Sequence, residues 1–143
     1  SGKDVAELVD LGFGRCRLIV AVPQASGIRD VQELDFNSRV ATIFPHITTE
    51  YFSRQGIQAE VVELNGSVEL GPIVGLADAI VDITETGTTL LENGLVPIAD
   101  VAQISTRLIA NQVSYKVKHG AIHILVKRLK AVLEAKMDTG MEG

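Results

Sequence analysis

The stretch Ala79-Ile80-Val81-Asp82-Ile83-Thr84-Glu85-Thr86-Gly87-Thr88-Thr89-Leu90 decides the fold of this chain. It begins as an apolar strand, continues as a short polar loop, and leads into a helix that we expect over residues 88–92. The same alternation of strands and helices extends from residue 18 to residue 94. It predicts an α/β domain with a mainly parallel sheet and helices on both of its faces.

Apolar runs and turn residues place the other elements around this stretch. Further strands are expected at residues 5–11, 18–22, 39–44, 59–64, 95–102 and 105–110. Further helices are expected at residues 26–34, 46–55 and 67–73. The clearest helix is C-terminal, with apolar residues at helical spacing: Ile122, Leu125, Val126, Leu129, Val132 and Leu133. Lys127, Arg128 and Lys130 lie off this stripe, so we expect a solvated basic face.

The composition is that of a globular protein: of the 143 residues in the chain, 46% are hydrophobic and 22% are charged. Aromatic residues make up only 4%, so the core must consist of Val, Ile, Leu and Ala, which suits buried parallel strands. The net charge of −5 gives no basic face for nucleic acid, and we expect no nucleic-acid partner. An anion would have to be bound by local geometry.

The cysteine count and the apolar runs indicate where the protein works. The single cysteine, Cys16, excludes a disulfide within the chain and favours a reducing compartment, and we expect it to be a core thiol. Every apolar run is shorter than the roughly 20 residues that span a bilayer. The N-terminus, Ser1-Gly2-Lys3-Asp4, does not read as a signal peptide. We therefore expect a soluble, cytoplasmic protein that does not bind a membrane.

The loop after the strand at residues 79–83 has the composition of an anion-binding site. Gly87 has no Cβ and lets the backbone approach a ligand, while Thr86, Thr88 and Thr89 supply hydroxyl donors. Unpaired amides at the start of the helix add further donors, so the loop can hold a phosphate monoester. Asp82, at the end of the strand, can accept hydrogen bonds from ribose hydroxyls.

A plain strand-to-helix turn with a threonine-rich cap explains the same spacing equally well. The loop is not a Walker A motif, because no Gly-Lys-Ser or Gly-Lys-Thr occurs at the required spacing. Gly12 and Gly14 lack the third glycine of a dinucleotide fingerprint. His119 and His123 are four residues apart, but no third ligand is evident, so we expect structural histidines there and no metal site.

Several motifs in order carry a resemblance to a known family. Gly75-Leu76-Ala77-Asp78-Ala79-Ile80-Val81-Asp82, with the residues at 86–90 and 92–95, resembles the phosphoribosyl-diphosphate signature of ATP phosphoribosyltransferases. The segments at 10–18, 39–42, 65–70 and 105–111 match that family in the same order. The resemblance covers nearly the whole chain, and it is far more specific than the loop alone.

The resemblance implies a fold of two α/β lobes like those of periplasmic binding proteins, with a cleft between them. Residues 1–18 would then be a remnant of the first lobe, and residues 19–96 would be the second lobe with the phosphoribosyl-diphosphate loop. Residues 97–136 would return to the first lobe and include the C-terminal helix. Residues 137–143 would be a tail.

The resemblance also implies an activity. ATP phosphoribosyltransferases join N1 of the adenine of ATP to C1 of the ribose of phosphoribosyl diphosphate, in the first step of histidine biosynthesis, and Mg²⁺ accompanies the diphosphate. The residues expected to bind the substrate are Asp82, Thr84, Glu85, Thr86, Gly87, Thr88 and Thr89, with Glu69 near the same pocket and Arg15 toward the nucleotide or pyrophosphate. The transfer needs positioning and charge stabilisation, so no catalytic Ser, Cys or His is required.

Two departures from the family qualify this expectation. The family begins with a longer N-terminal region that helps to build the ATP side, whereas this chain starts at Ser1. It also stops soon after the C-terminal helix, without a histidine-sensing third domain. That resembles the short form, which works with a separate regulatory subunit related to histidyl-tRNA synthetase.

Three interpretations follow. The chain is an enzyme, as a fragment or a shortened form; or a non-catalytic ligand-binding module of periplasmic-binding-protein type; or a structural subunit of the same complex. Because an incomplete first lobe would expose apolar surface, we expect a homo-oligomer.

Overall fold

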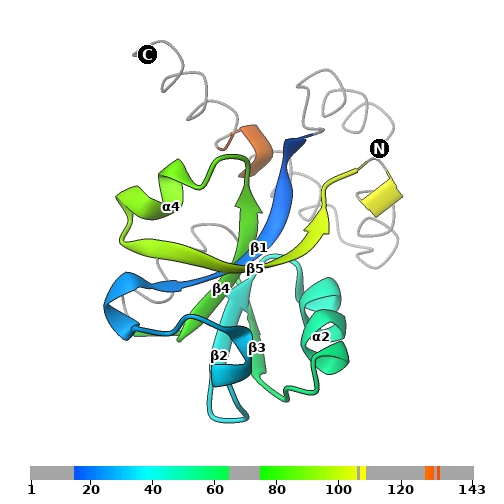
Figure 1. The fold of residues 1–143 in the computed structure, drawn as a ribbon. Helices are drawn as coiled ribbons and strands as arrows, with labels where there is room; N and C mark the ends of the chain where they lie inside the picture. Colours follow the sequence, from blue (N-terminus) through cyan, green and yellow to red (C-terminus); the bar gives the residue numbers. More distant parts are fainter. Residues whose placement is uncertain (1–14, 65–74, 106, 109–127, 131, 133–143) are drawn as a thin grey trace.

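The computed structural model describes residues 15–64, 75–105, 107–108, 128–130 and 132. These residues form one sheet of five strands in the order β3-β2-β4-β1-β5 (Figure 1). The strands are β1 (Arg17–Pro23), β2 (Arg39–Thr42), β3 (Glu60–Glu63), β4 (Ala79–Thr84) and β5 (Leu95–Gln103). The α/β class is confirmed.

Four of these strands run in one direction and β1 runs against them. β2 pairs in parallel with both β3 and β4. β1 is antiparallel to both of its neighbours, β4 and β5, so β4 and β5 run the same way on either side of it. The expectation of a mainly parallel sheet therefore holds for four strands. The strand expected at residues 18–22 is the exception, because β1 is inserted antiparallel between two strands that a crossover joins.

Two of the crossover connections run through helices of the described residues. α2 (Pro45–Arg54) joins β2 to its parallel neighbour β3, and α4 (Thr88–Glu92) joins β4 to β5 across β1. The two connections leave the centre of the sheet in opposite directions. Since such crossovers are right-handed, they lie on opposite faces, and Figure 1 shows α2 and α4 on opposite sides of the strands.

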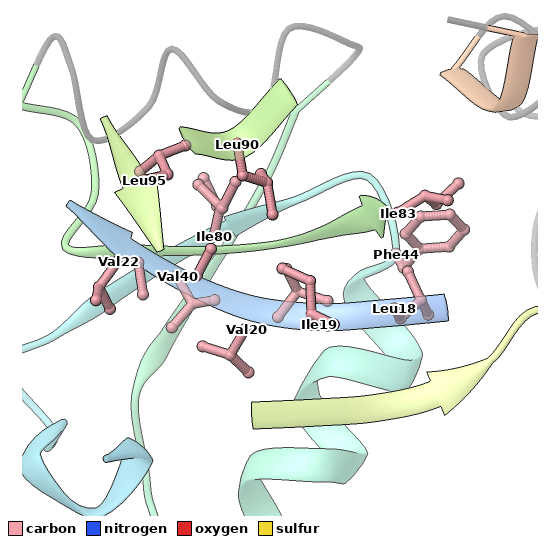
Figure 2. Close-up of a cluster of buried hydrophobic side chains, with 14 of the residues drawn as sticks. Leu18, Ile19, Val20, Val22, Val40, Phe44, Ile80, Ile83, Leu90 and Leu95 are labelled. Atoms are coloured by element: carbon pink, nitrogen blue, oxygen red, sulfur yellow. The ribbon is translucent and has the colours of Figure 1, made fainter. Parts of the chain in front are cut away.

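The core lies on both faces of the two central strands. All six residues of β4 are buried, as are the five inner residues of β1, which explains why both read as continuous apolar runs rather than as alternating ones. Figure 2 shows Ile80 of β4 in one cluster with Leu90 of α4 and Leu95 of β5. The cluster anchors the helix that follows the loop at residues 85–87.

Two of the expected elements differ in the structure, and each difference has a local cause in the backbone or in a side-chain cap. Residues 26–34 do not form one helix, because Gly27 has a φ of 74° and separates two 3-10 turns at Gln24–Ser26 and Val31–Glu33. Residues 107–108 are helical rather than extended. There the hydroxyl of Ser105 accepts a hydrogen bond from the amide of Leu108 at 3.1 Å, as an N-cap does.

Several expectations fall outside the described residues. They include the strand at 5–11, the helix at 67–73, the residues Glu69, His119 and His123, and most of the C-terminal helix. Residues 128–130 and 132 are helical, as expected for that segment. Within the described part of the chain, none of the helices is both long and apolar enough to cross a membrane.

Candidate functional site

The order of the strands predicts where on the sheet a ligand binds. The crossover from β2 leads toward one edge of the sheet and the crossover from β4 leads toward the other, so the strand order reverses between these two neighbours. In open α/β sheets, ligands bind at the carboxyl ends of the strands at such a reversal. The two segments that meet there are residues 43–44, which lead into α2, and the loop at residues 85–87, which leads into α4.

The loop at 85–87 is held in shape by its own side chains. Thr84, buried at the end of β4, accepts a hydrogen bond from the amide of Gly87 to its Oγ1 at 2.9 Å. Gly87 has a φ of 82°, in the left-handed region that a residue with a Cβ rarely adopts. The hydroxyls of Thr86 and Thr88 lie 2.9 Å apart, and the Thr86 hydroxyl also accepts from the Thr88 amide at 3.4 Å. The turn is thus fixed before any ligand arrives.

The start of α4 presents unpaired donors next to this turn. The first backbone bond of the helix runs from the amide of Leu91 to the carbonyl of Gly87. The amides of Thr89 and Leu90 precede it, and neither has an acceptor among the described residues. Such amides carry partial positive charge and favour an anion. With the hydroxyls of Thr86 and Thr88, the loop offers the donors that a phosphate group needs.

Asp82 lies three residues before the loop, inside β4 rather than at its end. Because side chains alternate along a strand, Asp82 and Thr84 share one face of the sheet. Asp82 is fully buried, and its carboxylate accepts from Arg128 Nε at 3.0 Å to Oδ1 and 3.1 Å to Oδ2. Arg128 Nη2 also donates to Oδ2, and the amide of Ile83 donates to Oδ1 at 2.8 Å.

This pairing corrects the expectation for Arg128. The residue is not part of a solvated face: its side chain is 12% exposed and ends on Asp82. Its neighbour Leu129 is fully buried, which docks this turn of the C-terminal segment against the core. The sequence indicates this burial, because Arg128 lies three residues after Leu125 and four before Val132, directly beside the apolar stripe.

The sheet brings Arg15 to the same edge as the loop. β1 is antiparallel to β4 with Arg17 opposite Thr84, so the exposed Arg15, two residues earlier, lies at the level of the loop. Arg17 itself donates to Asp100 at 2.9 Å, and its Nε is buried with no acceptor within the described residues.

The loop at residues 85–87 contains one carboxylate, that of Glu85. Glu85 is half-buried at the start of the loop. The described residues contain no group of three or more His, Cys, Asp or Glu side chains that could hold a metal ion. Mg²⁺ does not need such a group, since it keeps several waters and is commonly bound by one or two carboxylates together with substrate phosphates.

Comparisons with known proteins agree on one family. The family model HisG: ATP phosphoribosyltransferase matches residues 1–131 of this chain. The chain is 48% identical over 134 residues to the ATP phosphoribosyltransferase of Halothermothrix orenii, a match that covers 94% of this chain and 60% of that protein. The curated relatives it matches are therefore longer, and the chain spans about 60% of their length.

A solved ATP phosphoribosyl transferase is also similar to this chain. The ATP phosphoribosyl transferase (HisG:HisZ) complex from Thermotoga maritima is similar with a TM-score of 0.53 and 35% identity, over 84% of this chain and 57% of that one. The periplasmic VFT2 domain of Bordetella pertussis BvgS gives a TM-score of 0.49 at 20% identity, over 79% of this chain and 56% of that one.

Proposed function

This chain belongs to the ATP phosphoribosyltransferase family, and from that premise we propose that it carries the phosphoribosyl-diphosphate site of an enzyme that opens histidine biosynthesis. The reaction joins N1 of the adenine of ATP to C1 of the ribose, while the bond from C1 to the diphosphate breaks and pyrophosphate leaves. The observation that carries the proposal is the turn at residues 84–88, which is formed by its own hydrogen bonds at the reversal of strand order.

In the proposed complex, the 5-phosphate lies against the loop. The amides of Thr89 and Leu90 and the hydroxyls of Thr86 and Thr88 donate to its oxygens, and the absence of a Cβ at Gly87 lets the backbone come close. Thr84 contributes indirectly, because its hydroxyl already holds the Gly87 amide. Asp82 would accept from the ribose hydroxyls, on the same face of the sheet as Thr84.

The remaining residues have looser roles in this proposal. Arg15, at the level of the loop, would contact the nucleotide or the pyrophosphate, and Glu69 would complete the pocket. Mg²⁺ would arrive with the diphosphate and offset its charge as pyrophosphate leaves, with Glu85 as the carboxylate of the loop that could join its ligands. The chain's contribution is to orient ribose C1 and to stabilise charge, which is the help that such a displacement needs.

We also propose the partners that the family suggests. The Thermotoga maritima relative is described as a HisG:HisZ complex, and a corresponding regulatory subunit, together with self-association, is proposed for this chain. Sedimentation of the chain alone, and with a candidate regulatory subunit, tests both proposals.

A non-catalytic binding module is the second candidate. It is favoured by one observation: within the described part of the chain, the hydrogen bonds that shape the turn join residues 84–91 of the same sheet-and-helix unit. The loop can therefore form without the ATP side. Chromatographic detection of phosphoribosyl-ATP separates the enzyme from the module.

Calorimetric titration with phosphoribosyl diphosphate and Mg²⁺ tests the site. We expect the wild type to bind and Gly87→Val to lose binding, because Gly87 has a positive φ and faces the ligand. Gly27→Val is the matched control: Gly27 has a φ of 74°, and a Cβ there, as at Gly87, meets nothing within 4 Å. Equal loss in both variants, or no binding by the wild type, would contradict the proposal.

A further inference from the structure

We propose that Arg128 competes with the ligand for the carboxylate of Asp82. Its guanidinium acts as a latch, because it must leave Asp82 before the hydroxyls of a sugar can bind there. The inference rests on the proposed function, since it assumes that Asp82 contacts ribose hydroxyls. It adds a mechanism by which the C-terminal segment controls access to the phosphoribosyl site.

The carboxylate of Asp82 already has hydrogen-bond donors on both of its oxygens. A carboxylate accepts about four hydrogen bonds, two on each oxygen. Oδ1 of Asp82 accepts from the Ile83 amide and from Arg128 Nε, and Oδ2 accepts from Arg128 Nε and Nη2. Arg128 therefore supplies three of these four contacts. A ribose hydroxyl can bond to Asp82 only by displacing one of its donors.

The ion pair between Asp82 and Arg128 is shielded from solvent. Asp82 is fully buried, and the side chain of Arg128 is only 12% exposed. Leu129 and Val132, on the same helical segment, are buried at 0% and 8% exposure. Because the side chain of Arg128 is itself nearly buried, its guanidinium can leave Asp82 only if the packing around it loosens. Release of Asp82 is thus coupled, in this proposal, to at least partial undocking of residues 128–130 and 132.

The Ile83 amide and the Arg128 guanidinium differ in how easily they can leave Asp82. The Ile83 amide belongs to β4, a central strand of the sheet, and cannot withdraw without breaking its ladder. Arg128 is 46 positions away in sequence, on a segment at the carboxyl edge of the sheet (Figure 1). Of these two donors, Arg128 is the one that can leave. Ligand binding and docking of the C-terminal segment then oppose each other, and the coupling is reciprocal.

Binding of two simple probes tests the latch. Inorganic phosphate reaches only the loop, whereas ribose 5-phosphate adds the hydroxyls that need Asp82. We expect Arg128→Met to bind ribose 5-phosphate at least about fivefold more tightly than the wild type, the lower end of typical coupling between sites. Its affinity for inorganic phosphate should be unchanged. Lys130→Met is the control, because it removes the same charge from the same turn at a position that faces another side of the helix.

If Arg128→Met does not fold, a second variant and a measurement on the wild type still test the latch. Arg128→Lys keeps the charge but loses the two-point geometry, so it should show a smaller gain in the same direction. In the wild type, amide hydrogen exchange at residues 128–130 should become faster with saturating ribose 5-phosphate and stay unchanged with phosphate.

The outcomes separate the latch from the function. If phosphate and phosphoribosyl diphosphate bind but removal of Arg128 leaves ribose 5-phosphate affinity unchanged or lower, the latch is overturned and the phosphate site stands. Slower amide hydrogen exchange at residues 128–130 in the presence of ribose 5-phosphate would also overturn the latch and leave the phosphate site in place. If no variant binds any of the three ligands, the proposed function falls, and the latch falls with it.

Discussion

The guanidinium of Arg128 and the carboxylate of Asp82 form a buried two-point ion pair that joins the C-terminal segment to the central strand β4. A charge buried in this way is costly if its partner is removed. The pair therefore makes a prediction about stability that is independent of any ligand.

We expect Asp82→Asn to lower the free energy of unfolding by about 3 kcal/mol, because it removes the buried carboxylate with which the guanidinium of Arg128 pairs. Asn can still accept from the Ile83 amide, so the loss reports on the ion pair. Urea denaturation measures it. Asp100→Asn is the control, because it breaks an exposed pair with Arg17 and should cost less than about 1 kcal/mol. Equal losses in both variants would show that the Asp82 pair behaves as a surface pair.

The bond between Thr84 and Gly87 makes a second prediction. Thr84→Val keeps the shape of the side chain but leaves the Gly87 amide without its acceptor, so we expect a loss of about 1–2 kcal/mol in stability and weaker phosphate binding. Thr86→Val changes an exposed side chain, and it should weaken phosphate binding with a stability change within about 0.5 kcal/mol. Denaturation and calorimetry on both variants check this. A destabilised Thr86→Val would mean that the two hydroxyls have the reverse roles.

The parts of the fold that sequence could predict are those governed by neighbouring residues. The helix expected at 88–92 has those bounds in α4, and the strand expected at 79–83 is one residue longer in β4. Gly87 and the threonines around it specify this turn locally, through a positive φ and hydroxyl acceptors. The loop could therefore be read from the sequence before its surroundings were known.

The remaining features depend on partners distant in the chain. Nothing within residues 18–22 specifies that β1 runs antiparallel, since a strand buried on both faces has the same apolar composition in either direction. Arg128 meets Asp82 across 46 positions, and helical periodicity alone places it at the border of the stripe. The roles of Glu69, Arg15 and the loop residues toward a ligand stay predictions, which the experiments on binding address.

The capping box at Asp30 makes a third prediction. Asp30 accepts from the Gln32 amide at 2.9 Å, and Glu33 accepts from the Asp30 amide at 2.9 Å. Asp30→Ala removes one of these bonds and should cost about 1 kcal/mol in thermal or urea unfolding. Asp30→Asn keeps an acceptor and should cost clearly less. If the two variants are equally unstable, the charge of Asp30 matters more than its hydrogen bond.

Tyr51 makes the last prediction, which concerns alkaline pH. Burial raises the pKa of the Tyr51 phenol above its ordinary value of 10.0, and the negative charges of Asp30 and Asp100 raise it further. An unfolded tyrosine ionises first as the pH rises, while the folded one stays neutral. The contribution of Tyr51 to the free energy of unfolding is therefore complete below pH 10 and decreases as the pH rises toward the folded pKa.

Tyrosinate absorbance measures this directly, because the chain has no tryptophan and only two tyrosines, Tyr51 and Tyr115. The titration curve of the wild type minus that of Tyr51→Phe should have its midpoint above pH 10. Asp30→Asn should shift this midpoint down, because it removes one of the charges that oppose ionisation. Since the main cause is burial, the midpoint in Asp30→Asn should still exceed that of a free tyrosine. A difference curve centred at or below pH 10 would mean that Tyr51 is better solvated than its position in α2 implies.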